Sequence, residues 1–368
     1  MFSLQQIAVT QFKNYRHRSF QFHKKVVGIY GPNGTGKTNL LDAIYYLCFT
    51  KSYFSADSQL ALQGAAGFRV EGNFSLKGEN VPVVAVLRET GKKEFSLGGE
   101  MYGRLGKHIG KLPAVIIAPD DVAIITGGSE ERRKLFDALL CQVNPDYLQQ
   151  LMDYNKLLLQ RNSLLKQMAE TGSRSFDLLD ILDKQLVGAG AYVFDQRKIF
   201  LAIFLEKATA HYQTIAQSDE QVDLSYQSQL LPEVGGNSIE RFSKLLQQCR
   251  DKDLAMQRSS TGIHRDDLKL VLNNQPFKQI ASQGQRKSLL FALKLTEFEM
   301  LQEHKGFAPI LLLDDVFEKL DNDRMTNLLT EVCIEKKGQV FITDTHRDRL
   351  ENQLALIGCD FELINVEN

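Results

Sequence analysis

The pattern of apolar and polar positions changes twice along the chain. Its first part contains short strand-like runs, with apolar segments at 3–9 and 24–31 and a segment at 68–97 that alternates with a period of two. Because turn residues such as Gly and Asn separate its runs, the alternating segment predicts an antiparallel meander. The apolar run at 113–121 predicts one further buried strand.

Helical periodicity replaces this pattern from Ser129 to about Ala216, where Leu and Met recur at helical spacing. Pro145 and the polar segment 170–175 interrupt the pattern, so we expect an arm of several helices rather than one long helix. No heptad repeat is sustained across the segment, which argues against a long coiled-coil arm.

The last part of the chain returns to strand-like runs. Residues 309–314 and 338–343 predict two strands with a helix between them, and polar loops are expected at 218–223 and 232–238. One sheet built from both ends of the chain, with a helical insertion, is the simplest arrangement that fits this order. The sequence therefore predicts an α/β fold with an inserted helical arm.

The composition is that of an ordinary globular protein, with 43% hydrophobic and 24% charged residues. No stretch approaches the roughly 18 apolar residues of a membrane helix, and no signal-peptide pattern opens the chain, so we expect a cytoplasmic protein. The net charge of −1 disfavours a protein that coats nucleic acid by charge alone, and it leaves contact through a local basic patch open.

The five cysteines are scattered and show neither a CxxC spacing nor a nearby His at a metal-ligand spacing. This argues against a zinc site and against a disulfide framework. We interpret them as buried thiols that act as small hydrophobic residues.

Residues 31–38, with the sequence GPNGTGKT, match the phosphate-loop pattern GxxxxGK[ST] in full. They follow an apolar strand and precede an apolar helix, as the motif requires. The glycines let successive backbone N–H groups point at phosphate oxygens, and the helix N-terminus adds partial positive charge. We expect Lys37 to reach the β- and γ-phosphates of a nucleotide and Thr38 to coordinate Mg²⁺.

A second motif ends an apolar strand with two carboxylates, in the segment 310–321 with the sequence ILLLDDVFEKLD. Burying adjacent carboxylates is costly unless a cation accompanies them. Asp314 therefore fits a Mg²⁺-associated role and Asp315 fits the base that orients the attacking water. The alternative is a helix N-cap at a strand-to-helix turn.

Lys37 and Asp314 are 277 positions apart, far more than in compact phosphate-loop domains. A large insertion inside the nucleotide domain is typical of ABC-type ATPases, including SMC-like heads. That class predicts a signature motif before the acidic strand, and the segment 282–288, SQGQRKS, stands there. The alternative for this segment is a simple helix N-cap followed by basic solvated residues.

Further short motifs lie around this core: FKNY at 12–15, GIHRDDL at 262–268, LD at 320–321 and TDTH at 343–346. Together with the motifs above, the chain closely resembles the RecF family of bacterial recombination mediators, from end to end. The resemblance implies an ABC-type ATPase head with a mixed sheet and an antiparallel meander. Residues 1–125 and 261–368 would form this head around the phosphate loop, and residues 126–260 would form the helical arm.

The resemblance also implies the residues of the nucleotide site. Asp314 and Asp315 resemble the Walker B pair, and His346 resembles the switch histidine near the γ-phosphate, so Asp315, Lys37 and His346 would carry the catalysis. Gln63 is the candidate for the Q-loop. The residues that would lie at the nucleotide are Lys13, Asn14, Tyr15, Asn33, Gly34, Thr35, Gly36, Lys37, Thr38 and Asn39.

In ABC-type ATPases the signature residues face the ATP that the opposite subunit binds. Ser282, Gly284 and Gln285 would therefore cap the γ-phosphate of a partner copy in a two-fold symmetric dimer. The resemblance places Ser282, Gln283, Gly284 and Asp321, which belongs to the D-loop, at this dimer interface. ATP would then favour the dimer by mass action, and hydrolysis would loosen it.

The function that the resemblance implies is an ATP-gated clamp on duplex DNA near single-strand gaps, associated with the nucleoid. It would cooperate with RecR and RecO in loading RecA. Two other classes share the ATP motifs: a transporter motor subunit and an SMC-like structural tether. Because typical ABC ATPases have Glu where Asp315 stands, we expect slow, DNA-dependent hydrolysis that acts as a switch.

The chain departs from the family at two positions, with Lys13 for the usual Arg and Ile263 for the usual Pro. Lysine keeps the charge but loses the planar fork of arginine. For two segments the sequence leaves two alternative roles open. His264 and Arg265 either line the dimer face or DNA, or belong to a salt-bridged turn. The candidates for a DNA contact in the arm, which otherwise form a solvated helix face, are Arg132, Arg133 and Lys134.

Overall fold

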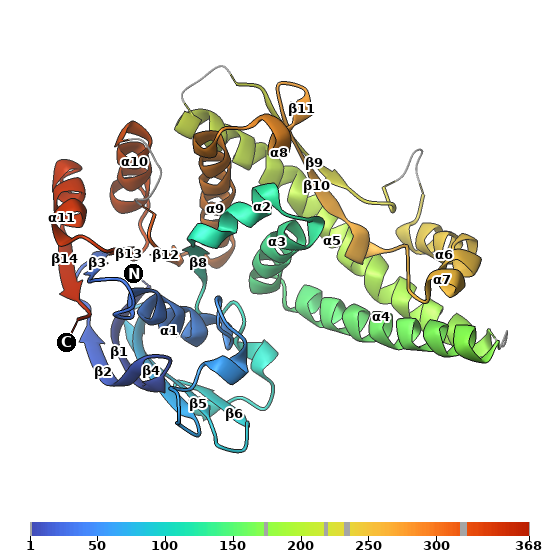
Figure 1. Ribbon diagram of the computed structural model, residues 1–368, viewed down its shortest axis with the longest axis horizontal. Coiled ribbons are helices and arrows are strands. Elements are labelled where there is room, and N and C mark those ends of the chain that lie inside the picture. The colour runs from blue at the N-terminus through green and yellow to red at the C-terminus, as the bar shows by residue number, and fades with distance from the viewer. Residues whose placement is uncertain (1, 173–175, 217–219, 232–235, 317–321, 368) are drawn as a thin grey trace. The chain divides into compact units, whose positions relative to one another are not determined.

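The computed structural model describes residues 2–172, 176–216, 220–231, 236–316 and 322–367 (Figure 1). It divides into two compact units. The first comprises Met1–Val122, Ala210–Asp219 and Ala281–Asn368, and the second comprises Ala123–Thr209 and Glu220–Ile280. The first unit is therefore assembled from both ends of the chain.

The first unit contains an antiparallel sheet with the strand order β2-β1-β4-β5-β6-β7. All of its strands come from the N-terminal part of the chain, and the predicted meander forms β4, β5 and β6. The bounds are β1 Ser3–Phe12, β2 Tyr15–Gln21, β4 Phe68–Leu76, β5 Glu79–Leu87, β6 Lys93–Leu97 and β7 Glu100–Met101.

A second sheet in the same unit is parallel, with the strand order β14-β3-β13-β12-β8. The N-terminal part of the chain supplies two of its strands and the C-terminal part supplies the other three, as predicted for a sheet built from both ends. Strands β3 and β12 are almost entirely apolar, as expected for strands covered on both faces. The bounds are β3 Val26–Tyr30, β8 Ala114–Ile117, β12 Ile310–Leu313, β13 Val340–Asp344 and β14 Phe361–Asn365.

Helix α1 (Lys37–Phe49) contacts strands of both sheets, so it lies in the core of the unit. Nearly all of its residues are buried, and an apolar surface on all sides is typical of such a helix. Gly72 of β4 permits the close approach, because a Cβ there would lie 2.6 Å from Leu47 of α1. Helices α9 (Gln283–Lys305), α10 (Asn322–Leu329) and α11 (Arg347–Leu356) lie on the other side of the parallel sheet (Figure 1).

The short elements of the first unit connect these layers. They are η1 Asp57–Gln59, η2 Leu105–His108, η3 Pro119–Val122 and the π-helical turn η5 Thr330–Glu335. The predicted mixed sheet is therefore resolved, in the part of the chain that the structure describes, into one antiparallel and one parallel sheet. The sequence pattern could not separate them, because β1 and β3 are both short apolar runs close together in the chain.

The second unit is mainly helical, as the periodicity of residues 129–216 predicts. Its helices are α2 Ala123–Thr126, α3 Ser129–Val143, α4 Pro145–Thr171, α5 Asp177–Ala216, α6 Ser238–Gln248, α7 Arg250–Met256, η4 Ile263–Arg265 and α8 Phe277–Ile280, and the last turns of α5 belong to the first unit. A small antiparallel sheet accompanies them, formed by β9 Val222–Gln227, β10 Asp267–Leu272 and β11 Gln275–Pro276.

Two predicted boundaries differ from the structure. Residues 222–223 were expected in a loop, but they begin β9. The strand contains several polar residues, so its sequence gives only a weak strand signal. Residues 261–280, expected with the C-terminal part of the head, cluster with the second unit because β10 pairs with β9. The division into a head and an arm otherwise stays a prediction.

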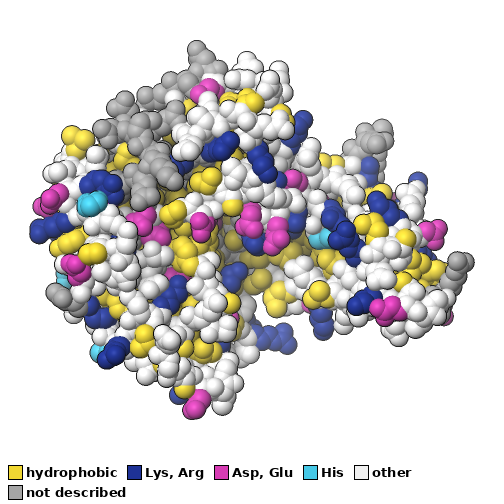
Figure 2. All heavy atoms as spheres, in the orientation of Figure 1, with side chains coloured by type: hydrophobic (Ala, Val, Ile, Leu, Met, Phe, Trp, Pro, Cys, Tyr) yellow, Lys and Arg dark blue, Asp and Glu magenta, His cyan; other side chains and the backbone are white. Residues whose placement is uncertain are grey.

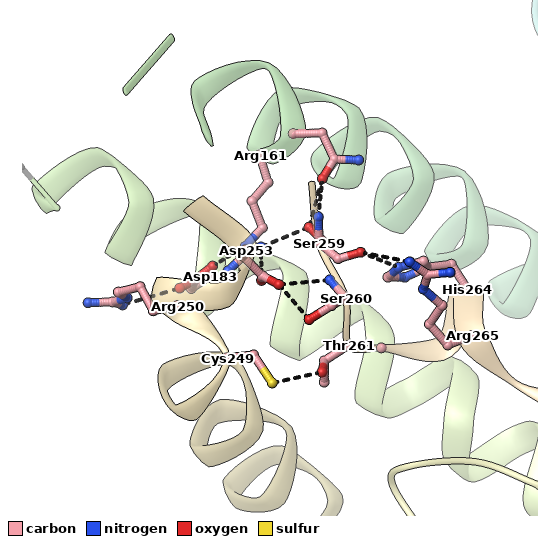
Figure 3. A network of polar contacts seen from close by, with 12 residues as sticks. Arg161, Asp183, Cys249, Arg250, Asp253, Ser259, Ser260, Thr261, His264 and Arg265 are labelled. Carbon is pink, nitrogen blue, oxygen red and sulfur yellow. Dashed lines mark hydrogen bonds and ion pairs between the residues drawn. The ribbon is translucent and has the colours of Figure 1, made fainter. Parts of the chain in front are cut away.

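The interior of the second unit contains charged residues. The guanidinium of Arg161, which is fully buried, donates to Asp183 at 2.6 Å and to Asp253 at 2.7 Å (Figure 3). Asp253 also accepts hydrogen bonds from the backbone and the hydroxyl of Ser260. These bonds hold the segment that follows α7 against α4.

His211, near the end of α5, carries the first pH-dependent prediction. Its two ring nitrogens lie 2.8 Å from Glu299 and 3.4 Å from Glu331. Burial alone would lower the pKa of His211, but its hydrogen bonds to the two carboxylates outweigh burial and raise this pKa above 6.5. The protonated ring therefore stabilises the fold below pH 6.5, and this contribution disappears as the pH rises through the raised pKa.

We expect His211→Gln to lower the free energy of unfolding more at about pH 6 than at about pH 8, because the contribution of the charged ring falls as the pH rises through its raised pKa. Urea unfolding of both proteins at the two pH values measures this. His17→Gln, at an exposed position of β2, is the matched control. An equal effect of His211→Gln at both pH values would contradict the prediction.

Candidate nucleotide-binding site

The phosphate-loop motif forms a turn between β3 and α1, as predicted. Gly31, Gly34 and Gly36 all have positive φ values, of 152°, 83° and 118°. At Gly36 a Cβ would lie 2.8 Å from both the Asn14 amide nitrogen and the Tyr15 hydroxyl. Glycine is therefore required there both for its backbone conformation and for space.

Lys37, the first residue of α1, is 4% exposed. Its ammonium donates to the carbonyl oxygens of Gly31 at 2.8 Å and of Pro32 at 3.1 Å. The cation thus lies inside the curve of the loop, where the sequence predicts that it contacts phosphates. Within the loop, the Thr35 hydroxyl donates to the Pro32 carbonyl at 2.8 Å, while Asn33 and Gly34 are exposed.

The phosphate loop and the acidic motif come from distant parts of the chain and meet at the carboxyl edge of the parallel sheet. The Thr38 hydroxyl lies 3.0 Å from both oxygens of Asp314. The hydroxyl of Thr343, at the end of β13, donates to Asp314 at 2.9 Å and accepts from the Asp315 backbone N–H at 2.8 Å. Thr343 thus holds both aspartates from β13, which lies between β3 and β12 in the sheet.

Asp314 is buried beside an adjacent acid. The pKa of its carboxyl is raised to about 6, chiefly by burial; the charge of Asp315 adds to this effect, and the hydrogen bonds from Thr343 and Thr38 oppose it. A carboxylate in this position is stabilised by a cation. The oxygen atoms of Thr38 and Asp314 suit Mg²⁺, which is usually held by one or two protein carboxylates and by phosphates.

Among the described residues, no cluster of three His, Cys, Asp or Glu could hold a metal ion by itself. A metal at Thr38 and Asp314 would therefore depend on the nucleotide phosphates for the rest of its ligands.

Asp315 is one of the few non-glycine residues in the left-handed region, with a φ of 45°. Such a conformation is uncommon outside Gly, and Asp and Asn adopt it more readily than other residues. The hydrogen bond from its N–H to Thr343 holds it there. The regular strand conformation therefore ends at Asp315, directly after Asp314.

The FKNY segment lies against the loop. The Asn14 amide donates to the Thr35 carbonyl at 2.9 Å and its oxygen accepts from Asn39 at 2.8 Å. The Tyr15 hydroxyl donates to the Gly36 carbonyl at 3.0 Å, and burial raises the pKa of Tyr15 to about 12. These contacts hold the loop from the side of the β1–β2 turn.

Lys13, predicted near the nucleotide, has its ammonium 2.5 Å from Asp42 of α1. Both side chains are buried, so the ion pair accounts for a basic residue at this position without a planar fork. Gln63 is exposed and follows the bridge between Phe12 and Ala61.

His346 is exposed at the start of α11, and its backbone N–H donates to Asp344 at 2.8 Å. Asp344 itself is fully buried and forms two hydrogen bonds with Arg349. Sequence reasoning assigned no role to Thr343 or Asp344, although both end a predicted strand, which is the signal that marks Asp314. Asp321 lies outside the described residues.

The signature segment begins α9 with a capping box. The Ser282 hydroxyl accepts from the Gln285 N–H at 3.2 Å, and the Gln285 side chain accepts from the Ser282 N–H at 2.7 Å. The alternative of a helix N-cap is therefore correct as a description of the local structure. Ser282 and Gln283 are nevertheless exposed, so this helix end can contact a second molecule.

A pocket with a volume of about 300 Å³ lies between α9 and the end of β12. Gln283, Arg286 and Lys287 of α9 line one wall of the pocket, and Asp314 and Asp315 line another. The signature helix and the acidic pair are thus neighbours within one chain.

The arm candidates behave differently from one another. Arg132 is buried and pairs with Asp267 through two hydrogen bonds of 2.5 and 3.0 Å, which leaves it unsuited to contact DNA. Arg133 donates to the Asp266 carbonyl at 2.7 Å. Lys134 is exposed and lies 3.0 Å from both Glu130 and Glu131, as expected for a solvated helix face.

The GIHRDDL segment forms the turn η4 and the start of β10. His264 lies 3.2 Å from the Ser259 carbonyl (Figure 3). It also lies 2.7 Å from the Tyr154 hydroxyl, and burial lowers its pKa to about 4. Asp266 pairs with the buried Arg197 at 2.7 Å. Of the two alternatives, the local structure is that of a salt-bridged turn. Within residues 262–268, only Arg265 is exposed.

On the face seen in Figure 2, Lys and Arg side chains are interspersed with Asp and Glu. This agrees with the net charge of −1 and with the expectation that any nucleic-acid contact uses a local patch.

Comparison with known proteins gives the same picture over the whole chain. The family described as RecF/RecN/SMC N terminal domain matches residues 3–62. The DNA replication and repair protein RecF of Flavobacterium johnsoniae is 40% identical over 95% of both chains. That of Parabacteroides distasonis is 38% identical over 99% of this chain and 97% of its own.

Solved structures agree with this assignment. The recombination mediator protein RecF with ATPrS, from the RecFOR pathway, superimposes with a TM-score of 0.89 at 30% identity and covers 100% of this chain and 97% of its own. An Smc head domain from Pyrococcus furiosus has a TM-score of 0.57 at 16% identity over 99% of this chain and 93% of its own, which shows a shared fold. The predicted ABC-type ATPase head is therefore confirmed.

The phosphate loop, the paired aspartates and the exposed start of the signature helix thus belong to a head of the ABC and SMC type, and full-length relatives match the chain from end to end. The chain belongs to the RecF family of DNA replication and repair proteins.

Proposed function

We propose that the chain is an ATP-driven DNA clamp, in which ATP and Mg²⁺ join two copies head to tail and slow hydrolysis releases them. The observation that carries the proposal is the pairing of Thr38 with Asp314, at 3.0 Å, in the same unit as the exposed N-terminal end of α9, which Ser282 caps. The first feature suits a nucleotide with its metal, and the second suits a partner molecule.

At the nucleotide, the backbone from Asn33 to Thr38 binds the phosphates and Lys37 leaves the carbonyl oxygens of its own loop for them. Asn14 and Asn39 brace the loop from the side through their mutual hydrogen bond. Thr38 and Asp314 would hold Mg²⁺, which supplies charge neutralisation at the phosphates.

Asp315 accepts the proton of the attacking water, and His346 contacts the γ-phosphate side of the site. Lys13 acts through Asp42 on α1 rather than through the nucleotide, and Gln63 completes the site only if its loop moves. Hydrolysis removes the γ-phosphate and with it the contacts that favour the dimer.

The dimer interface consists of Ser282, Gln283, Gly284 and Asp321 of each copy. The exposed N-terminus of α9 offers backbone N–H groups and a partial positive charge to the γ-phosphate in the partner. The capping box then holds Ser282 in place until the partner docks.

DNA and protein partners enter the proposal through the family. Relatives carry the name DNA replication and repair protein, and two solved relatives belong to the RecFOR pathway. We infer that the clamp binds duplex DNA beside single-strand gaps on the nucleoid and works with RecR and RecO upstream of RecA. In the arm, Arg133 and Lys134 remain the candidates for DNA contact.

The transporter alternative is not favoured, since full-length relatives are RecF proteins. No helix among the described residues is both long and apolar enough to cross a membrane. The SMC-like alternative shares the fold but is at 16% identity.

The test is ATP hydrolysis with and without gapped DNA. We expect gapped DNA to stimulate the wild type and Lys37→Met to lose hydrolysis by about 100-fold or more, because the phosphates lose their cation. Lys51→Met, at an exposed position after α1, is the matched control and should hydrolyse ATP normally. Hydrolysis that ignores DNA, or that survives in Lys37→Met, would contradict the proposal.

A further inference from the structure

A buried charged cluster lies on α9, twelve residues beyond Ser282. Lys294 is 4% exposed, Glu297 is 4% exposed and Asp121, on the turn η3, is 6% exposed. The Lys294 ammonium lies 3.4 Å from Glu297 and 3.9 Å from Asp121. Burying three charges is costly unless they compensate one another, and none of them contacts the nucleotide site described above.

Lys294 keeps its charge in this place. Burial by itself would lower the pKa of Lys294, but the carboxylates of Glu297 and Asp121 raise it above its usual value. The ammonium is therefore charged at neutral pH and forms the centre of the cluster.

Tyr53 connects the cluster to the helix that follows the phosphate loop. Its hydroxyl donates to Asp121, and its ring lies under the Lys294 ammonium, 5.9 Å from Nζ to the ring centroid. Its backbone N–H donates to Asp42 of α1 at 2.8 Å. The ring also packs edge-on against Tyr45 of α1, with centroids 5.1 Å apart.

Asp42 completes the path. It is fully buried on α1 and accepts a hydrogen bond of 2.6 Å from the Ser52 hydroxyl, in addition to the bond from Tyr53 and the ion pair with Lys13. A continuous series of partly or fully buried polar contacts thus runs from α1, which carries Lys37 and Thr38, to α9, which Ser282 caps.

Both ends of this path belong to the proposed ATP cycle. Lys37 begins α1 at the phosphates, and the exposed end of α9 begins at Ser282. A rigid connection between them would let a nucleotide at the loop determine where the signature end of the same chain stands.

We propose that Lys294 is a positioning residue whose ion pairs with Asp121 and Glu297 fix α9 relative to α1, so that ATP bound at the phosphate loop places Ser282 for docking on a second copy. This inference rests on the proposed function. It assigns Lys294 to the coupling between ATP binding and dimer formation, and not to ATP binding or to stability.

A purely structural role predicts something different. Replacing a buried ion pair by an apolar residue of similar volume is often close to neutral for folding. Lys294→Met keeps most of the side-chain volume and removes the charge, and Tyr53→Phe keeps the ring and removes the hydroxyl bond to Asp121. Neither residue contacts the nucleotide, so both variants should bind ATP like the wild type.

The experiment measures two quantities for each full-length variant: ATP affinity by equilibrium dialysis, and the ATP concentration for half-maximal dimer formation by light scattering. For Lys294→Met we expect ATP affinity within about 2-fold of wild type, and about a 10-fold or greater rise in the ATP needed for dimers, within the range of coupling free energies. Tyr53→Phe should move the same quantity in the same direction. Lys305→Met, at the other end of α9, is the matched control and should change neither.

The outcomes distinguish failure of the proposed function from failure of the inference about Lys294. A wild type that never forms ATP-dependent dimers overturns the proposed function. A wild type that does, with Lys294→Met dimerising at the same ATP concentration, overturns only the inference. Loss of ATP binding in Lys294→Met would make the cluster part of the nucleotide site and would also overturn it. If Lys294→Met does not fold, unchanged dimerisation of Tyr53→Phe is decisive against the coupling.

Discussion

Asp315→Asn is expected to slow ATP hydrolysis by about 100-fold or more, the usual contribution of a general base, while leaving ATP binding intact. The amide has the shape of the carboxylate but cannot accept the proton of the attacking water. Asn also tolerates the left-handed backbone that Asp315 adopts at a φ of 45°, so the turn after β12 should be kept. The hydrogen bond from the residue 315 N–H to Thr343 is likewise unaffected.

The same substitution should prolong the ATP-bound dimer, because the γ-phosphate that holds the two copies together is removed more slowly. Single-turnover hydrolysis and the lifetime of the dimer after dilution measure the two effects. Asp223→Asn, at an exposed position of β9, is the matched control. If the lifetime of the dimer is unchanged in Asp315→Asn, hydrolysis does not control release, and the role assigned to Asp315 in release is wrong.

Arg161→Met is expected to lower the free energy of unfolding of the helical unit by about 3–5 kcal/mol, the range measured when one partner of a buried ion pair is removed. Arg161 is fully buried and lies between Asp183 and Asp253. Without the guanidinium, two carboxylates remain in the interior with no countercharge from Arg161. The Ser259 hydroxyl, 2.8 Å from the guanidinium, loses a partner as well (Figure 3).

Urea unfolding followed by circular dichroism measures this loss. Lys166→Met, also on α4, removes an exposed pair with Glu170 whose atoms lie 3.9 Å apart. Exposed pairs of this kind contribute about 0–1 kcal/mol, so this control should unfold like the wild type. A similarly small effect of Arg161→Met would mean that the buried network does not hold the arm together.

The sequence predicts the turn between β3 and α1 and the acidic end of β12, because each is a local motif. The phosphate loop is contiguous in the chain, and the two aspartates follow an apolar strand. The sequence gives no sign of the role of Thr343, which contacts Asp314 only because β13 lies beside β12 in the sheet. The order of strands in a sheet cannot be predicted from any short segment of the sequence.

In the helical arm, the sequence does not predict which charged residues are buried. Arg132, Arg133 and Lys134 form a basic run, and only the tertiary structure shows that Asp267 holds Arg132 in the interior. His264 is likewise buried against Tyr154. A pattern of charges predicts a surface, but partners distant in the chain decide which charges are buried.

The central claim is that the signature segment acts on the ATP of a second copy. Light scattering of the wild type and of Ser282→Arg, without nucleotide, with ADP and with ATP and Mg²⁺, tests it directly. We predict that only ATP doubles the molar mass of the wild type and that Ser282→Arg stays monomeric, because its side chain fills the exposed helix end that should receive the partner. A mass that never responds to ATP, or that doubles equally in Ser282→Arg, would contradict the account.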